Sequence, residues 1–141
     1  MKTIFVKPAQ IQRKWYLIDA ENQVLGKVAV KAAHLIRGKH KATFVPHQEV
    51  GDYVIIINAD KAIVTGGKEE KKIYHHHTQF PGGLRSVNYG SLLKRRATRP
   101  MELAVKGMLP KGRLGRKLFT NLKVYAGADH PHAAQKPEVV K

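Results

Sequence analysis

The chain has 141 residues, enough for one domain with a buried core and too few for two full domains. Hydrophobic residues make up 43% of it, which excludes a basic disordered tail. The 26 Lys and Arg residues face 10 Asp and Glu, and the formal net charge of +16 indicates a polyanionic partner. Nucleic acid is the first candidate for that partner, and an anionic membrane surface is the second.

The charge is distributed unevenly along the chain. Between Lys71 and Tyr125, 13 cations accompany a single acid, Glu102, whereas a surface built only for solubility would mix the two signs. We therefore expect the partner to cover much of this segment.

Several classes of protein are disfavoured at once. The absence of cysteine excludes a disulfide framework and a thiolate metal site. The longest apolar run, residues 53–57, is too short to span a bilayer, and the first 15 residues show no secretory signal pattern. The sequence therefore predicts a cytoplasmic protein with no membrane partner.

Secondary structure can be assigned in chain order. WYLI, residues 15–18, predicts a first strand. Residues 24–37 carry apolar side chains at helical spacing, and Gly38 provides a C-terminal stop. The small apolar side chains of this helix suit packing on a sheet better than insertion into a membrane surface, whereas its lysines lie on the opposite side.

Strands follow in the middle of the chain. YVIII, residues 53–57, is continuously apolar, which is typical of a strand buried on both faces of a parallel sheet. Residues 61–65 predict another strand, which ends at Gly66-Gly67. Residues 71–77 predict a more polar strand, and FPGG, residues 80–83, predicts a turn.

The second half of the chain is expected to be largely helical. Helices are predicted for residues 91–96, from Pro100 to about residue 108, and for residues 115–121, and residues 122–127 form a last strand or extended segment. The order of elements predicts a small three-layer α/β/α domain. Its expected boundaries are an N-terminal arm at 1–13, a single α/β RNA-binding domain at 14–127 and an extended C-terminal tail at 128–141.

A nucleotide-dependent enzyme is the first functional alternative. Gly107 and Gly112 have the spacing of a P-loop, but Arg113 and Leu114 follow where that motif needs Lys and then Ser or Thr. The strand-end acids Asp19, Asp52 and Asp60 are more typical of turns and helix caps than of catalysis. The sequence therefore predicts a protein that is not an enzyme, with no cofactor and no small-molecule substrate.

The histidines are candidate metal ligands. Adjacent residues of a strand point to opposite faces, so at most His75 and His77 of the His75–His77 tripeptide could share an ion. Acids are scarce around them. We therefore expect no metal site, and we expect these rings and those of His130 and His132 to contact nucleic acid.

Glycines or helix ends adjoin Lys or Arg in five clusters, which suits close approach of a phosphate backbone. No helix carries a major-groove reading pattern, and scattered basic loops suit folded RNA better than DNA. The predicted RNA-binding residues are Lys27, Lys31, Arg37, Lys39, His40, Lys41, His47, Lys68, His75, His76, His77, Arg85, Lys94, Arg95, Arg96, Lys106, Lys111, Arg113, Arg116, Lys117, His130 and His132.

The sequence also resembles a known family. VKGMLP, the following G-x-x-G-R and LKVYAG are similar to the signature region of ribosomal protein thirteen of the large subunit, in its bacterial form. The resemblance includes LGKVA, RGKHK, GDYVIIINA, TGGK, KIYHHH and FPGGLR upstream and the HPHAAQKPE tail downstream. It extends over nearly the whole chain, with the motifs in order.

The resemblance implies a mostly parallel four-stranded sheet. It also implies a non-catalytic ribosomal component that binds large-subunit ribosomal RNA directly, joins assembly early and adjoins other large-subunit proteins. The family's basic pattern falls on Arg37, Lys39, His40, Lys41, Lys68, His76, Arg85, Lys106, Lys111 and Arg116. This chain departs from the family at His75–His77, where Tyr-Arg-His is common, and at Gly112. A free RNA-binding regulator outside the ribosome remains the alternative.

Overall fold

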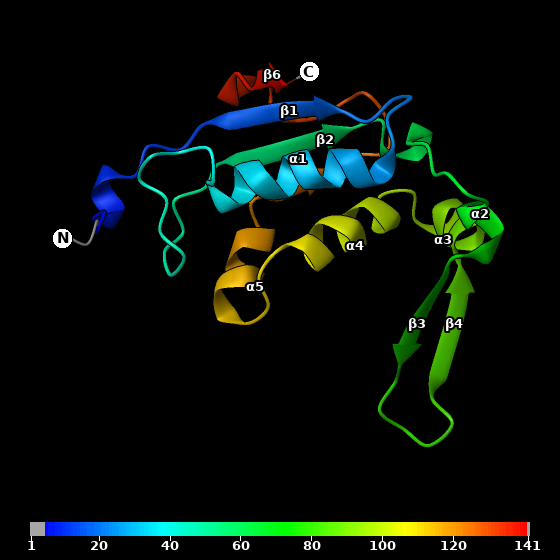
Figure 1. Cartoon of the computed structure of the whole chain (residues 1–141). Helices are drawn as coiled ribbons and strands as arrows, with labels where there is room; N and C mark the ends of the chain where they lie inside the picture. Colours follow the sequence, from blue (N-terminus) through cyan, green and yellow to red (C-terminus); the bar gives the residue numbers. More distant parts are fainter. Residues whose placement is uncertain (1–4, 141) are drawn as a thin grey trace.

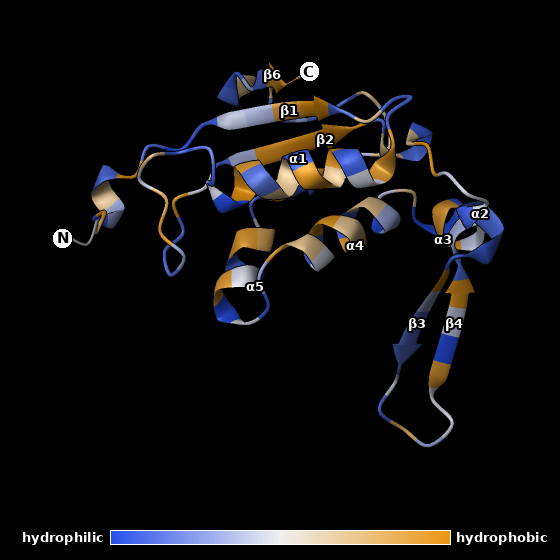
Figure 2. Ribbon diagram, in the orientation of Figure 1, coloured by the Kyte–Doolittle hydropathy of each residue, from blue (hydrophilic) through white to orange (hydrophobic). Residues whose placement is uncertain are grey.

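A four-stranded parallel sheet forms the centre of the protein, whose computed structural model describes residues 5–140 (Figure 1). Its strands are β1 (Trp15–Asp19), β2 (Tyr53–Ile57), β5 (Leu122–Val124) and β6 (Glu138–Val140), in the order β5-β2-β1-β6. The apolar β2 lies between β5 and β1, as expected for a strand buried on both faces. Figure 2 shows this strand largely in the hydrophobic colour.

Helix α1 (Leu25–Arg37) lies along one face of this sheet (Figure 1). Its alanines let it approach closely, and Ala29 and Ala32 are fully buried. Gly38 ends the helix in the left-handed conformation at φ 80°, where its N–H donates to the carbonyls of His34 and Leu35. The predicted helix and its stop are therefore confirmed.

Helices α4 (Arg99–Met108) and α5 (Arg113–Phe119) join α1 around one hydrophobic cluster. Met101 and Val105 of α4 and Leu118 of α5 are fully buried in it. The same cluster contains Ile18, Val54 and Ile56, and these side chains project from the face of the sheet that α1 covers. This packing fixes the position of the connection between α4 and α5.

A two-stranded antiparallel hairpin projects from the body of the protein (Figure 1). It consists of β3 (Ile73–His77) and β4 (Leu84–Asn88). The short helices α2 (Lys68–Lys71) and α3 (Tyr89–Arg95) pack at its base. An isolated hairpin is at best marginally stable in water. Packing against α2 and α3, and contact with any partner, therefore help to keep this hairpin ordered.

The other face of the sheet carries aromatic side chains. The Trp15 ring stacks on Tyr53 at 4.5 Å between centroids and on His132 at 5.1 Å. His132 directly precedes the short 3-10 helix η3 (Ala133–Gln135). Two further 3-10 helices are η1 (Pro8–Gln10) and η2 (Ala59–Lys61). The C-terminal segment thus covers part of the face opposite α1.

The predicted α/β fold with a parallel four-stranded sheet is confirmed, but three strands differ from the prediction, and one of them is β4 of the hairpin, for which no strand was predicted. Residues 61–65 were expected to form a strand; they contain the end of η2 and one isolated bridge between Val24 and Ile63. The fourth strand is β6, which pairs with β1. Residues 138–140 of the predicted tail therefore belong to the sheet. The division at 13 and 127 stays a prediction.

Within the described residues, no helix is long and apolar enough to cross a membrane.

Candidate nucleic-acid interface

Most of the predicted RNA-binding cations are exposed. Their ammonium or guanidinium groups form no ion pair with any residue between 5 and 140, although the chain contains ten acids. The residues of this kind are Lys27, Lys31, Lys39, Lys68, Arg85, Lys94, Arg95, Arg96, Lys106, Lys111, Arg113 and Arg116. Uncompensated charge of one sign on this scale attracts a polyanion.

The densest group surrounds the connection between α4 and α5, and we call it the basic junction: Lys106, Lys111, Arg113, Arg116 and Lys117. Lys106, Lys111 and Arg116 line a hollow of about 580 Å³ whose floor includes the Phe119 ring. The Lys106 ammonium lies 6.0 Å from the centroid of that ring. This combination of cations, glycine backbone and an aromatic ring suits an RNA strand. The cations can bind its phosphates, and the apolar surface can contact its sugars and bases.

Glycines determine the shape of this junction. Gly112, at φ 101°, adopts a backbone conformation that residues with a side chain rarely accept. A Cβ atom on Gly115 would lie 1.6 Å from the carbonyl oxygen of Pro110, so only glycine permits this close approach. The sequence pattern G-x-x-G-R therefore folds α5 back onto the end of α4 and places Arg113 and Arg116 at the surface.

Lys117 differs from the other cations of the basic junction, because its ammonium lies 3.0 Å from Glu49 Oε2. Glu49 also accepts hydrogen bonds from Arg13 at 3.1 Å and from Asn121 at 2.8 Å. Burial works to raise the pKa of Glu49, but the Asn121 hydrogen bond, Lys117 and Arg13 outweigh it and hold the pKa below its usual value. Glu49 is thus a charged anchor beneath the junction.

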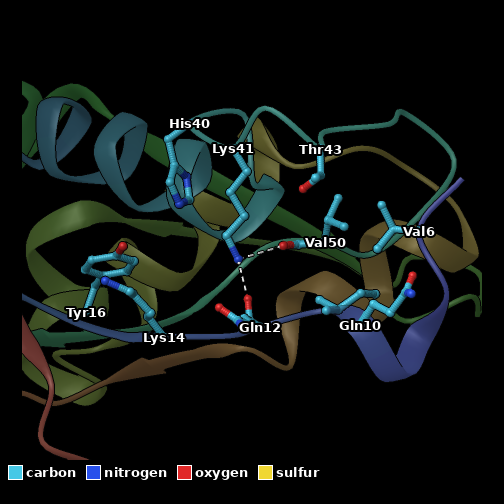
Figure 3. Close-up of a pocket in the computed structure, with 10 residues that line it drawn as sticks. Val6, Gln10, Gln12, Lys14, Tyr16, His40, Lys41, Thr43 and Val50 are labelled. Carbon is cyan, nitrogen blue, oxygen red and sulfur yellow. Dashed lines mark hydrogen bonds between the residues drawn. The ribbon is translucent and has the colours of Figure 1, made fainter. Parts of the chain in front are cut away.

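In the RGKHK cluster after α1, Lys41 and His40 make contacts within the protein. The Lys41 ammonium donates to the carbonyls of Gln12 at 2.8 Å and Val50 at 3.0 Å, as Figure 3 shows, and to Asp52 Oδ1 at 2.6 Å. His40 Nε2 lies 2.9 Å from the other Asp52 oxygen.

The two remaining cations of this cluster behave differently. Arg37 donates to the Pro46 carbonyl at 2.8 Å and lies 5.5 Å from the Phe44 ring centroid. Lys39 is exposed and makes no ion pair in the described part of the chain. Within RGKHK, Lys39 therefore has the cation most available to an external phosphate.

The hairpin places its histidines on two faces. His75 and His77 share one face with Ser86 and Leu84, whereas His76 lies opposite Arg85 on the other face. His75 Nδ1 is 2.8 Å from Ser86 Oγ, and His77 Nδ1 accepts from the Gln79 amide at 2.9 Å. His76 and Arg85 are therefore exposed cross-strand neighbours on the other face of the hairpin.

The C-terminal histidines contribute to packing. His132 Nε2 lies 2.7 Å from the Tyr125 hydroxyl, its ring stacks on Trp15, and its amide donates to His130 Nδ1 at 3.2 Å. Both rings are half-buried, whereas His47 is exposed. No group of three or more potential ligands that could hold a metal ion occurs among the described residues.

Sequence reasoning left out further exposed cations, three of which lie in the segment that contains only one acid. Lys71, Lys72 and Lys123 are exposed and have no ion-pair partner in residues 5–140. Their signal was present, because all three lie in the segment from Lys71 to Tyr125 with its single acid. Asp52 and Glu49 were not recognised as anchors, since their partners are distant in the sequence.

Comparison with known proteins identifies the family. The model of the family Ribosomal protein L13 matches residues 13–131. The chain is 56% identical over 141 residues to the large ribosomal subunit protein uL13 of Treponema denticola, covering 100% of this chain and 99% of the relative. It is 58% identical over 137 residues to uL13 of Carboxydothermus hydrogenoformans, covering 97% and 96%. The predicted resemblance is confirmed, and the chain belongs to the ribosomal protein L13 family.

Proposed function

We propose that this chain is a structural constituent of the large ribosomal subunit, that it binds large-subunit ribosomal RNA directly and that it contributes to early subunit assembly. Full-length relatives that are more than half identical are named as large ribosomal subunit proteins. A ribosomal protein of this family is a structural component and not an enzyme, in agreement with the sequence prediction.

The observation that best supports direct RNA binding is the basic junction. Four of its cations, Lys106, Lys111, Arg113 and Arg116, are exposed and form no ion pair within the described residues. Glycine backbone lies beside them, so phosphates can approach without steric conflict. Release of condensed counterions from the RNA then provides much of the binding free energy.

The exposed cations are spread over several elements, which favours a folded RNA. Lys27 and Lys31 lie on α1, Arg85 lies on the hairpin, and Lys94 to Arg96 lie at the end of α3. A protein with basic groups on a projecting hairpin and on a helical body can contact more than one RNA segment. Such contacts would fix the segments relative to each other, as an early assembly protein must do. Neighbouring large-subunit proteins are expected to share part of this surface.

Sedimentation of a gentle cell lysate through a sucrose gradient tests the proposed location. The protein, followed by antibody, should travel with the large subunit at low salt and resist moderate salt. Migration as a free small protein at both salt concentrations would contradict the ribosomal role and favour a free RNA-binding regulator.

Direct RNA binding is tested separately with purified protein and large-subunit ribosomal RNA. If about 8 phosphates are neutralised, the logarithm of the association constant should fall with the logarithm of salt concentration at a slope near −7 on a duplex and less steeply on single strands. A slope near zero would contradict phosphate-dominated binding.

A further inference from the structure

We propose that a hollow at the amino end of α1 binds an unpaired nucleobase of RNA, with Lys68 and Lys72 holding the adjoining phosphate. This inference rests on the proposed RNA-binding function and adds a specific subsite to it. The hollow measures about 270 Å³ and lies between the start of α1, the α2–β3 segment and α4. It is separate from the basic junction.

The walls of the hollow are mainly apolar. Leu25, Ile63, Ala104 and Met108 line it together with the rings of Tyr74 and Tyr89. A bare phosphate gains little in such surroundings, because an anion loses hydration without a compensating partner. A nucleobase, in contrast, is flat and apolar on its faces and stacks well on aromatic side chains.

Two residues that line the hollow carry a hydrogen-bonding group without a partner within the described residues. Tyr89 is 2% exposed, and its buried hydroxyl has no hydrogen-bond partner. The Gly26 N–H at the first turn of the 13-residue helix α1 also makes no hydrogen bond there. The Tyr89 hydroxyl is buried, and buried polar groups are normally satisfied in the functional state, whereas Gly26 is half-buried. The polar edge of a base can supply acceptors for both.

The protonation state of Tyr89 supports a donor role. Burial, assisted by the negative charge of Glu69, raises the pKa of the Tyr89 hydroxyl above its usual value. The hydroxyl therefore keeps its proton at neutral pH. It can then donate to a carbonyl or ring nitrogen of a base, alongside the Gly26 N–H.

Lysines mark the place of the phosphate. Lys68 and Lys72 line the same hollow, and both are exposed without an ion-pair partner in residues 5–140. The Lys72 ammonium lies 5.3 Å from the centroid of the Tyr74 ring. The ammonium can bind the phosphate, and the neighbouring ring can stack on the base, so both contacts come from the same side of the hollow.

The experiment compares three variants of the full-length protein in binding to large-subunit ribosomal RNA. Tyr89→Phe removes only the unpartnered hydroxyl, Ala104→Phe fills the hollow, and Tyr16→Phe is a matched control outside it. Thermal unfolding of each RNA-free variant is measured as well. If Ala104→Phe proves to be misfolded, the RNA affinity of Tyr89→Phe alone tests the subsite. We expect Tyr89→Phe to bind RNA about 3- to 10-fold more weakly without a lower melting temperature, since one hydrogen bond to RNA is lost.

The salt dependence distinguishes base from phosphate contacts. Tyr89→Phe should leave the salt slope unchanged, whereas Lys68→Ala should reduce its magnitude by about 0.7–0.9. Wild-type RNA affinity in Tyr89→Phe, or an equal loss in Tyr16→Phe, would overturn the subsite while the RNA-binding function stands. Failure of the wild-type chain to bind the RNA would instead overturn the proposed function.

Free nucleotides are the other possible source of a base. The amide resonance of Gly26 can be followed by NMR while AMP, GMP, CMP or UMP is added to the RNA-free protein. We expect no saturable shift at micromolar concentration, because one base and one phosphate provide few contacts. Saturation at that concentration, combined with unchanged RNA binding in Tyr89→Phe, would assign the hollow to a free nucleotide and overturn the RNA subsite.

Discussion

The Lys41 ammonium lies 2.6 Å from Oδ1 of Asp52, whose side chain is fully buried. The same carboxylate oxygen accepts the Lys14 amide at 2.8 Å. This pair therefore ties the loop after α1 to the beginnings of β1 and β2. A lysine in a basic sequence cluster is here a structural element of the α/β body.

Replacement of Lys41 by Met should destabilise the RNA-free protein by about 3 kcal/mol, because it leaves a buried carboxylate without its closest cation. The melting temperature should fall by about 10 °C. Calorimetry or circular dichroism can measure this change. Lys39→Met is the matched control, since Lys39 is exposed, and should melt within about 0.5 kcal/mol of the wild type. Equal melting temperatures for the two variants would contradict a structural role of Lys41.

The two glycines at the α4–α5 connection should respond to alanine in opposite directions. In Gly115→Ala the new Cβ would lie 1.6 Å from the Pro110 carbonyl oxygen, so α5 must move and stability should fall by more than about 2 kcal/mol. Gly107 lies in α4, and its Cβ would meet nothing within 4 Å. Gly107→Ala should therefore stabilise the protein by about 0.5–1 kcal/mol, as expected in a helix. Chemical denaturation of both variants tests this contrast.

Stability should also depend on pH through Glu49. The pKa of Glu49 is lowered in the folded protein, so its contribution is present above pH 4.5, its ordinary value, and is lost as the pH falls through the folded pKa. The stability difference between the wild type and Glu49→Gln should therefore be largest near neutral pH and shrink below pH 4.5. Denaturation at a series of pH values measures it. Glu70→Gln, at an exposed carboxylate, should show no comparable trend.

The sheet and the main helices were predictable because their signals are local. The continuous apolar run of β2 and the apolar spacing of α1 depend on neighbours within a few residues. β6 carried no such signal: only three residues long, it is defined by pairing with β1 more than 100 residues earlier. Residues 61–65 had the composition of a strand but lack a ladder partner beyond the single bridge at Ile63.

The candidate site shows the same distinction between local and long-range signals. Which residues are cationic, and that glycines accompany them, could be read from the sequence. The sequence did not show which cations form ion pairs within the protein, because these pairs depend on buried acids that only the folded structure places next to them. Asp52 engages Lys41 from 11 positions away, and Glu49 engages Lys117 from 68 positions away. Lys39 and Lys41, two residues apart, consequently have different roles.

Charge reversal at Arg113 and Arg116 tests the basic junction. Both side chains are exposed and form no ion pair in the described chain, so changing both to Glu should leave the melting temperature of the RNA-free protein nearly unchanged. RNA affinity should fall strongly, because two phosphate contacts become repulsive, and the salt slope should lose about 2 units in magnitude. The double variant Lys7→Glu, Lys136→Glu is the control for charge alone, since it also replaces two exposed cations by acids. A large loss of melting temperature in the Arg113/Arg116 variant would show instead that the arginines support the fold. An equal loss of RNA affinity in the Lys7/Lys136 variant would show that net charge, and not the junction, governs binding.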